Sequence, residues 1–349
     1  MKLLKPKRLR PGDTVAVVSL SSGMLGEPEF IHKYHLAKER LERDFGLRVI
    51  PMPNALRGVE YLDLHPEARA ADLMDAFRSP EIRGVINAIG GDDTVRLLPY
   101  IDFDVLRQNP KVFTGFSDTT TNHFMLHKAG VISYYGPCIM CNFSEYGKIN
   151  DYTERMIRRT LFDPEPTLDI PAAPYWYDDE DGRIWWKEEN LHVFKPYHPD
   201  DHGYDVIQAG PAAEGELLGG CIDVFPEILG TALWPSREDW EGKLLMLETS
   251  EVDMSPELLT WYLRGLAAQG IFDAVRGVLV GRPARHSRWE AYKAAYRRVV
   301  GLECGRPELP ILGNVNFGHA EPIGVFPLGV RARLDTAART ITLLESATE

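Results

Sequence analysis

The sequence predicts an α/β protein in which a parallel sheet covered by helices on both faces is followed by a smaller β/α domain. Between residues 14 and 165, short apolar runs alternate with amphipathic stretches of helical period. Repeated β-α units of this length form such a sheet. The pattern stops near residue 163 and resumes near residue 215. We therefore predict an N-terminal domain over 1–165, a connector over 166–214 and a C-terminal domain over 215–349.

The N-terminal domain opens with the apolar run Thr14–Ser19, which is typical of a buried strand. The next segment places Ile31, Ala37 and Leu41 on one face of an amphipathic helix, and Gly46 ends that helix. The alternation continues with strands expected at 47–50, 84–91, just before residue 117 and at 131–135, and with helices near residues 66–77, 97–98 and 122–129.

Three polar or glycine-rich loops follow strands of this sheet: Ser19–Gly23, Gly90–Thr94 and Gly115–Asp118. In parallel sheets, functional loops lie at the carboxyl ends of the strands. We therefore expect these loops to meet at one edge of the sheet.

The connector has no regular period and is rich in proline and acidic residues. Three tryptophans stand in it, at Trp176, Trp185 and Trp186. Long irregular loops in enzymes are often lids or binding segments. The alternative, that the indoles simply pack the connector onto a domain, is equally open.

The C-terminal domain contains strand patterns at 244–248, 277–281 and 311–317. Ser255-Pro256 is a good helix start, and a second helix is expected over 289–300. A hairpin over 329–334 and 339–344 ends the chain.

Composition excludes several classes of function. The net charge of −12 over 349 residues argues against a nucleic-acid polymer as partner, and no run of roughly 18 apolar residues predicts a membrane span. The basic N-terminus lacks the apolar block of a signal peptide. Four cysteines are too few for a disulfide scaffold, and the pair Cys138 and Cys141 has no second pair to complete a zinc site. We expect a cytoplasmic protein that uses no metal or other cofactor.

The Gly-Phe-Ser-Asp sequence of residues 115–118 joins a short strand to a helix. A serine on such a hinge is exposed beside the N–H groups of the new helix, which suits a nucleophile. The local pattern favours a simpler interpretation, in which Ser117, Asp118 and Thr119 only cap the helix.

A serine nucleophile needs a base and a group that orients the base. His319 follows a strand and a glycine that permits a tight turn, whereas the other histidines are expected on solvated helix surfaces (32, 35, 123 and 127) or in polar loops (65, 192, 198, 202 and 286). Glu248 ends an apolar strand, where a carboxylate must be paired. Glu251 is the alternative carboxylate.

The Gly90-Gly91 pair offers unhindered N–H groups at a strand end. The N–H groups of Gly91 and Asp118 suit an oxyanion hole, and Gly90 and Asp92 are expected to contact the substrate. The same Gly-Gly-Asp-Asp-Thr loop, residues 90–94, is also similar to phosphate-binding loops of some ATP-using kinases, but no other nucleotide-binding loop motif accompanies it.

Several stretches resemble the murein LD-carboxypeptidase family, in the same order over nearly the whole chain: residues 9–17, 69–77, 89–91, 115–118, 135–137, 219–220, 247–248 and 317–319. That family comprises LD-carboxypeptidases and the microcin C self-immunity peptidases. The resemblance implies an amidotransferase-like (flavodoxin-like) N-terminal domain, a smaller C-terminal β/α domain and a homodimer. It also implies a serine peptidase whose triad is Ser117, Glu248 and His319.

The long connector is more similar to the microcin-immunity branch, in which a mobile loop supplies an aromatic side chain that stacks on adenine. The resemblance assigns that part to Trp185 or Trp186. It implies a peptidyl or aminoacyl nucleotide as substrate, with a murein tetrapeptide as the alternative. Cys221 stands where the family commonly has Asn, and Asp92-Asp93 where a bulkier residue often follows the glycines, which leaves the specificity open.

Overall fold

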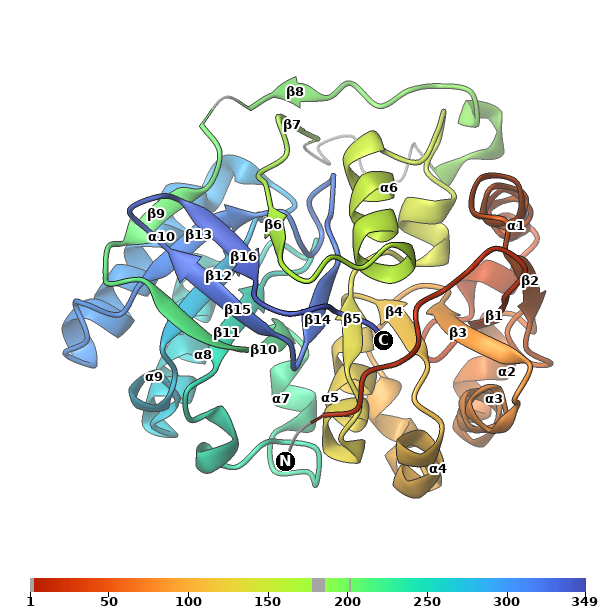
Figure 1. Cartoon of the computed structure of the whole chain (residues 1–349), viewed down its shortest axis with the longest axis horizontal. Helices are drawn as coiled ribbons and strands as arrows, with labels where there is room; N and C mark the ends of the chain where they lie inside the picture. The colour runs from red at the N-terminus through yellow and green to blue at the C-terminus, as the bar shows by residue number, and fades with distance from the viewer. Residues whose placement is uncertain (1–2, 178–185, 201) are drawn as a thin grey trace.

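Two sheets, drawn mainly from opposite halves of the chain, organise the fold (Figure 1). The computed structural model describes residues 3–177, 186–200 and 202–349. Within these residues the strands form a six-stranded sheet, an eight-stranded sheet and a separate two-stranded pair. The first half of the chain lies on the right of Figure 1 and the last third on the left.

The six-stranded sheet has the order β14-β5-β4-β3-β1-β2. Five of its strands are parallel, and the sixth, β14, runs antiparallel beside β5. Without β14 the order is that of a flavodoxin-like sheet, so the predicted fold class is confirmed. The strands are β1 (Thr14–Val18), β2 (Arg48–Pro51), β3 (Ile82–Asn87), β4 (Val112–Gly115), β5 (Ser133–Tyr135) and β14 (Phe326–Leu328).

Helices cover both faces of this sheet, as expected from the alternation along the sequence. In β1, Val15 and Val17 belong to the apolar cluster that contains Leu41, whereas Ala16 belongs to the cluster that contains Leu73. Successive strand residues therefore point to opposite helical layers. The helices are α1 (Ile31–Phe45), α2 (Val59–Leu64), α3 (Pro66–Arg78), α4 (Phe103–Gln108), α5 (Thr119–Ala129) and α6 (Asp151–Ile157).

The eight-stranded sheet has the order β6-β16-β15-β10-β11-β12-β13-β9, with a parallel centre and antiparallel flanks. The predicted C-terminal hairpin is confirmed as β15 and β16. The strands are β6 (Leu168–Ile170), β9 (Asp205–Gln208), β10 (Ala213–Cys221), β11 (Leu244–Glu248), β12 (Gly277–Gly281), β13 (Ile311–Val315), β15 (Arg331–Asp335) and β16 (Thr340–Leu343). The helices are α7 (Phe225–Ile228), α8 (Pro256–Ala268), α9 (Ile271–Ala274) and α10 (Trp289–Tyr296).

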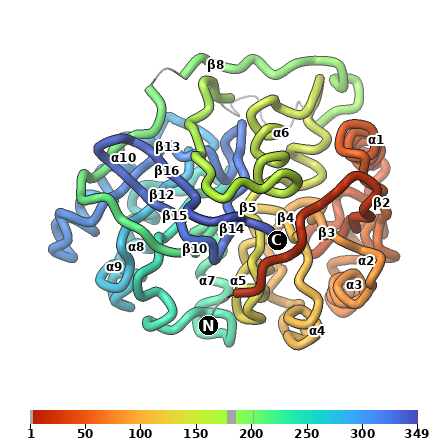
Figure 2. Tube along the Cα trace, in the orientation of Figure 1, coloured from red at the N-terminus to blue at the C-terminus, as the bar shows by residue number. Residues whose placement is uncertain are grey.

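The connector is more regular than its sequence indicated. It contributes the two outer strands of the eight-stranded sheet, β6 and β9, and the small pair β7 (Tyr175–Trp176) and β8 (His198–Pro199). These strands are only two to four residues long, too short to show a period of two. Between them the connector runs along the upper edge of the molecule (Figure 2).

A buried ion-pair cluster fastens the connector to the rest of the fold. Lys195 places its Nζ 3.1 Å from a carboxylate oxygen of Glu145 and 2.6 Å from one of Glu321. Burial and the neighbouring Glu321 raise the pKa of Glu145 well above its usual range. Burial acts in the same direction on Glu321, but the Lys195 ammonium outweighs it and lowers the pKa of Glu321. The Lys195 ammonium thus pairs most closely with the Glu321 carboxylate, and the Glu145 carboxyl group, whose charged form is disfavoured, lies beside them.

The backbone adds a second contact between the connector and the rest of the fold, because the Tyr177 N–H donates to the Glu321 carbonyl at 2.9 Å.

All four cysteines are free thiols. Among the described helices, none has the length and apolar character needed to cross a membrane.

We predict that Lys195→Met lowers the free energy of unfolding by about 3 kcal/mol, because the buried Glu321 carboxylate loses the ammonium that contacts it. Urea unfolding followed by tryptophan fluorescence measures the change. Lys187→Met removes an exposed ammonium from the same connector and is the matched control. Equal midpoints for the two variants would contradict the assigned role of the cluster.

Candidate active site

Ser117 occupies a strained turn between β4 and α5. Its φ is +64°, a backbone conformation that residues other than glycine rarely adopt. The turn is held by two hydrogen bonds, from the Ser117 N–H to the Tyr135 hydroxyl at 3.1 Å and from the Thr120 N–H to the Ser117 carbonyl at 2.8 Å. This geometry turns the Ser117 hydroxyl away from the helix and into a cavity.

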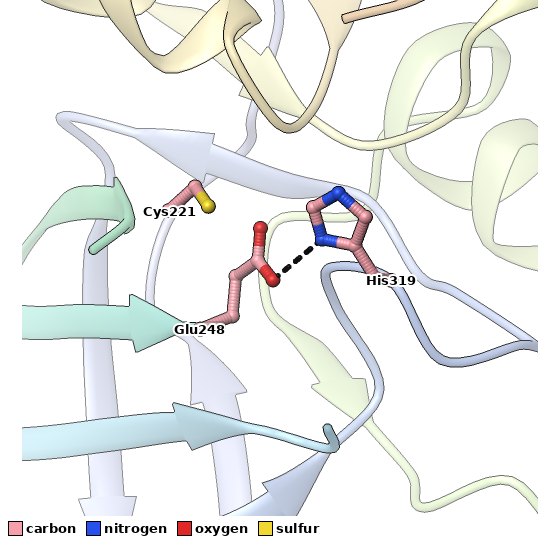
Figure 3. A group of neighbouring side chains, drawn as sticks. All are labelled: Cys221, Glu248 and His319. Carbon is pink, nitrogen blue, oxygen red and sulfur yellow. Dashed lines mark hydrogen bonds and ion pairs between the residues drawn. The ribbon is translucent and has the colours of Figure 1, made fainter. Parts of the chain in front are cut away.

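His319 lies beside that hydroxyl, in the loop that follows β13. Its Nε2 is 3.0 Å from Ser117 Oγ, and its Nδ1 is 2.8 Å from Glu248 Oε2 (Figure 3). Glu248 ends β11, as the apolar strand pattern predicted. Gly318 has a φ of +94°, and a Cβ there would lie 2.6 Å from the Glu248 carboxyl carbon. Glycine at 318 is therefore required for the histidine to reach Glu248.

Tyr135 is a site residue that the sequence analysis did not identify. Its hydroxyl donates to Glu248 Oε1 at 2.5 Å and accepts the Ser117 N–H. Burial and the Glu248 carboxylate raise the pKa of this phenol well above its usual value, so it remains a donor. The available signal was its position at the end of β5, next to the strand that carries Ser117.

The charges around His319 favour its protonated form. Burial alone would lower the pKa of this imidazole, but the carboxylates of Glu248 and Glu251 outweigh burial and raise it well above its usual value. Glu248 is fully buried, and its two oxygens are satisfied by Tyr135 and His319.

Glu251, the alternative carboxylate in the sequence, approaches His319 from the other side. Its Oε2 lies 3.1 Å from His319 Nε2, the nitrogen that also faces Ser117. The Glu251 side chain is 57% exposed, whereas that of Glu248 is 0% exposed. The two carboxylates thus occupy opposite nitrogens of one imidazole.

The Gly90–Thr94 loop lies against the serine turn, as predicted. A Cβ on Gly90 would be 2.7 Å from the Ser117 Cβ and 3.1 Å from the Asp118 nitrogen, so only glycine fits there. Neither the Gly91 N–H nor the Asp118 N–H has an acceptor among the residues that the structure describes. Gly90, Gly91 and Asp92 all line the cavity, whereas Asp118 is buried directly beneath the serine turn.

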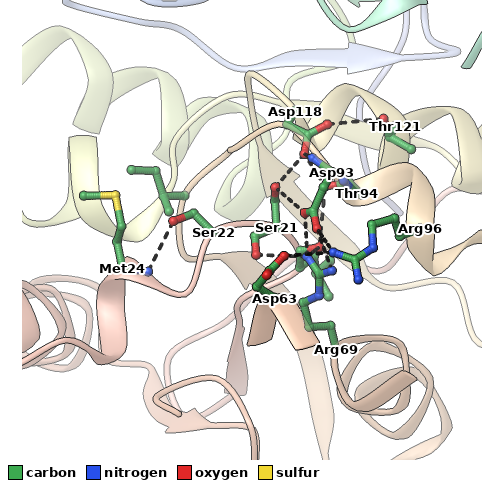
Figure 4. Close-up of polar contacts among 12 residues, drawn as sticks. Ser21, Ser22, Met24, Asp63, Arg69, Asp93, Thr94, Arg96, Asp118 and Thr121 are labelled. Carbon is green, nitrogen blue, oxygen red and sulfur yellow. Dashed lines mark hydrogen bonds and ion pairs between the residues drawn. The ribbon is translucent and has the colours of Figure 1, made fainter. Parts of the chain in front are cut away.

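The Asp118 side chain does not cap α5, in contrast to the helix-cap interpretation of the sequence. Its buried carboxylate instead accepts hydrogen bonds from the Ser21 hydroxyl at 2.6 Å, the Asp93 N–H at 3.0 Å and both the N–H and hydroxyl of Thr94 (Figure 4). These donors come from the loops after β1 and β3. Asp118 therefore joins the three loops that the sequence placed at one edge of the sheet.

Asp93 is held by guanidinium groups. Arg69, which is fully buried, forms a two-pronged ion pair with it at 2.6 and 2.9 Å, and Arg96 contacts it at 2.9 Å. The kinase interpretation would require this loop to hold a metal or a phosphate. The Asp93 carboxylate is already held by two guanidinium groups, whereas Asp92, the aspartate directly after the glycines, lines the cavity.

Two helix histidines are buried rather than solvated, which corrects the sequence analysis. His123 lies in α5, which packs between β5 and β10, and its ring bonds Ser133 and the Gly115 carbonyl. Burial lowers the pKa of His123 to about 4. His32 is 8% exposed and contacts the Tyr146 hydroxyl. The other two differ from each other: His35 is exposed and His127 is half-buried.

Cys221, Glu248 and His319 each place one potential metal-ligand atom within 4.8 Å of the others (Figure 3). A metal would need the thiolate form of Cys221. Burial, Glu248 and Asp223 raise the pKa of the thiol well above its usual range. The donor set therefore fits hydrogen bonding better than metal binding.

The serine, the histidine and the Gly90-Gly91 pair open into a cavity of about 610 Å³. Trp186 also lines this cavity; its ring packs edge-on against Phe30, with the ring centres 6.0 Å apart, and the Lys33 ammonium lies 5.7 Å from the indole ring centre. Burial lowers the pKa of Lys33 to about 8. Lys195 of the buried cluster is a further lining residue. Trp185 lies outside the described residues, so its predicted contact stays a prediction.

Comparison with known proteins identifies both halves of the chain. Residues 15–136 match the LD-carboxypeptidase N-terminal domain, and residues 214–334 match the LD-carboxypeptidase C-terminal domain. A protein of Streptomyces coelicolor named as a carboxypeptidase is 30% identical, with 98% of this chain and 96% of that protein covered. The microcin C7 self-immunity protein MccF of Escherichia coli is 25% identical over 79% of this chain and 78% of its own length.

A solved structure of an MccF-like protein from Streptococcus pneumoniae, in complex with AMP, superposes with a TM-score of 0.87. It is 34% identical in sequence, and the match covers 95% of this chain and 98% of that one. The two domain matches together span most of the sequence, and they contain the strands that position Ser117 and Glu248 and the loop that carries His319. This chain belongs to the LD-carboxypeptidase family of peptidases.

Proposed function

We propose that this protein is a serine peptidase that hydrolyses the amide bond of peptidyl or aminoacyl nucleotides. The observation that carries the proposal is the continuous hydrogen-bonded series from Ser117 Oγ through His319 to Glu248 at the wall of one cavity. Nucleophile, base and orienting carboxylate in this order are the requirements for acyl transfer.

In the proposed reaction, neutral His319 takes the Ser117 proton through Nε2 as Oγ attacks the carbonyl carbon. The Nδ1–H group keeps donating its hydrogen bond to Glu248. This contact fixes the tautomer of His319 and stabilises the imidazolium. The N–H groups of Gly91 and Asp118 stabilise the oxyanion. His319 then gives its proton to the leaving nitrogen, and water, activated by the same imidazole, hydrolyses the acyl-enzyme.

The nucleotide part of the proposal is supported by an aromatic residue in the cavity. Trp186 lines the same cavity as Gly90 and Asp92. A base stacked on an indole gains about 1–3 kcal/mol. The Streptococcus pneumoniae relative, which holds AMP, supports the same substrate class. A murein tetrapeptide, cleaved by the same chemistry, is the second candidate, since the family name refers to that activity.

A paired assay tests the substrate. Alanyl sulfamoyl adenosine and a murein tetrapeptide are incubated with the protein, and released products are separated by chromatography. Turnover of the nucleotide conjugate supports the proposal. Turnover of the tetrapeptide alone would replace it with an LD-carboxypeptidase. A homodimer and a cytoplasmic location stay predictions, and light scattering tests the first.

We predict that Ser117→Ala lowers kcat by at least about 10³-fold, because the attacking oxygen is lost. The melting temperature should not fall, since alanine removes only the hydroxyl. Ser79→Ala, remote from the cavity, is the matched control and should retain full activity. Activity of the Ser117→Ala protein equal to wild type on both substrates would exclude the triad.

The rate should rise with pH above neutrality. Because the pKa of His319 is raised, the imidazolium persists to higher pH than for an ordinary histidine, and only the neutral form accepts the Ser117 proton. The acidic limb of kcat/KM should therefore lie above pH 6.5. A profile that stays flat down to about pH 5 would contradict this assignment.

Trp186→Ala should raise KM for the nucleotide conjugate about tenfold or more, with little change in kcat, because stacking contributes to binding and not to the acyl transfer itself. Trp186→Phe should restore part of the affinity. Steady-state kinetics on both substrates separate the cases: an equal loss on the murein tetrapeptide would mean that Trp186 only packs the connector.

A further inference from the structure

His319 Nε2 faces two oxygens that make opposite demands on it. Ser117 Oγ lies at 3.0 Å and Glu251 Oε2 at 3.1 Å. A carboxylate is only an acceptor, so its approach to Nε2 is favourable when that nitrogen carries a hydrogen. Nδ1 also carries a hydrogen, because it donates to Glu248. With Glu251 in this position, His319 is an imidazolium and does not accept the Ser117 proton.

Glu251 is placed to leave this position, whereas Glu248 is not. The Glu248 carboxylate is fully buried and held by Tyr135 as well as His319. The Glu251 side chain is 57% exposed and lies in the turn after β11, where it lines the cavity. Because this side chain reaches solvent, a shift of Glu251 uncovers Nε2 on the substrate side.

The surroundings of Glu251 favour a positive charge. Asp92 and Asp223 line the same cavity. Lys33, Lys195 and Arg285 also line it, and Lys195 is paired with Glu145 and Glu321. Glu227 lies there too, but burial and nearby aspartates raise its pKa to about 8, so it is largely neutral at pH 7. Among the described residues, the Cys221 thiol and, through Glu248, the Tyr135 phenol also lie near His319, and burial raises the pKa of each well above its usual range.

We propose that Glu251 is a specificity residue that binds an ammonium group next to the scissile carbonyl and thereby releases His319 to act as the base. The inference rests on the proposed hydrolytic function. When the ammonium pairs with Glu251, the carboxylate leaves Nε2. The imidazolium then gives the Nε2 proton to bulk water, and the neutral ring faces the Ser117 hydroxyl.

This role selects a class of substrate. In an aminoacyl conjugate the α-nitrogen is free and cationic, and it is one carbon away from the carbonyl that Ser117 attacks. Glu251 and Ser117 both contact His319 Nε2. One bound substrate can therefore place its ammonium group on Glu251 and its carbonyl carbon at Ser117. Within a peptide the α-nitrogen is acylated and uncharged. The protein should therefore prefer acyl groups with a free α-amine.

The test compares alanyl sulfamoyl adenosine with its N-acetyl derivative, as kcat/KM over a range of pH. Wild type should prefer the free amine by about tenfold or more. Glu251→Gln should lose this preference, and its acidic limb should move to lower pH by about one pH unit, because one carboxylate no longer stabilises the imidazolium. At mildly acidic pH the variant should cleave the N-acetyl derivative faster than wild type does.

Glu257→Gln removes an exposed carboxylate that does not line the cavity and should match wild type throughout. An unchanged pH profile and preference in Glu251→Gln would overturn the inference, as would equal losses on both conjugates. If wild type cleaves only the murein tetrapeptide, the proposed substrate class is overturned. In that case the pH profile for the tetrapeptide tests whether Glu251 keeps His319 protonated: the acidic limb of Glu251→Gln should then lie at lower pH than that of wild type, and an unchanged limb overturns this role. Retained activity in Ser117→Ala marks failure of the proposed function itself.

Discussion

The buried Glu248 carboxylate is the group on which the arrangement of the site depends. A carboxylate removed from water must find donors for both oxygens. Its two donors come from different parts of the molecule: Tyr135 ends a strand of the six-stranded sheet, and His319 follows a strand of the eight-stranded sheet. Because both donors bind this one carboxylate, the two sheets meet at Glu248. The histidine then lies beside the Ser117 hydroxyl.

Residues at strand ends could be predicted from the sequence because parallel topology determines where they meet. Ser117, Glu248 and the Gly90-Gly91 pair each follow or end an apolar run, and the carboxyl ends of neighbouring parallel strands share one edge. His319 required one more signal, the glycine before it. The order of these motifs along the chain then indicated the family, which the domain matches confirm.

Contacts between residues distant in sequence could not be predicted. Lys195 pairs with carboxylates that lie 50 and 126 residues away, and its own segment has no period. His123 was misjudged for a related reason: a helix covered by sheets on both sides has no solvent face for the pattern to reveal. The Asp118 carboxylate, interpreted as a cap, instead joins loops that only the folded sheet brings together.

The placement of β14 has a consequence for how the protein is made. This strand, residues 326–328, pairs with β5 and closes the edge of a sheet whose other strands end by residue 135. During synthesis the N-terminal half emerges first and holds β5 as an open edge until almost the whole chain has left the ribosome. Ser117 is thus translated early, whereas its partner His319 follows 202 residues later and β14 later still. By the proposed mechanism, a nascent chain that ends before His319 therefore carries Ser117 without a base and does not cleave amides.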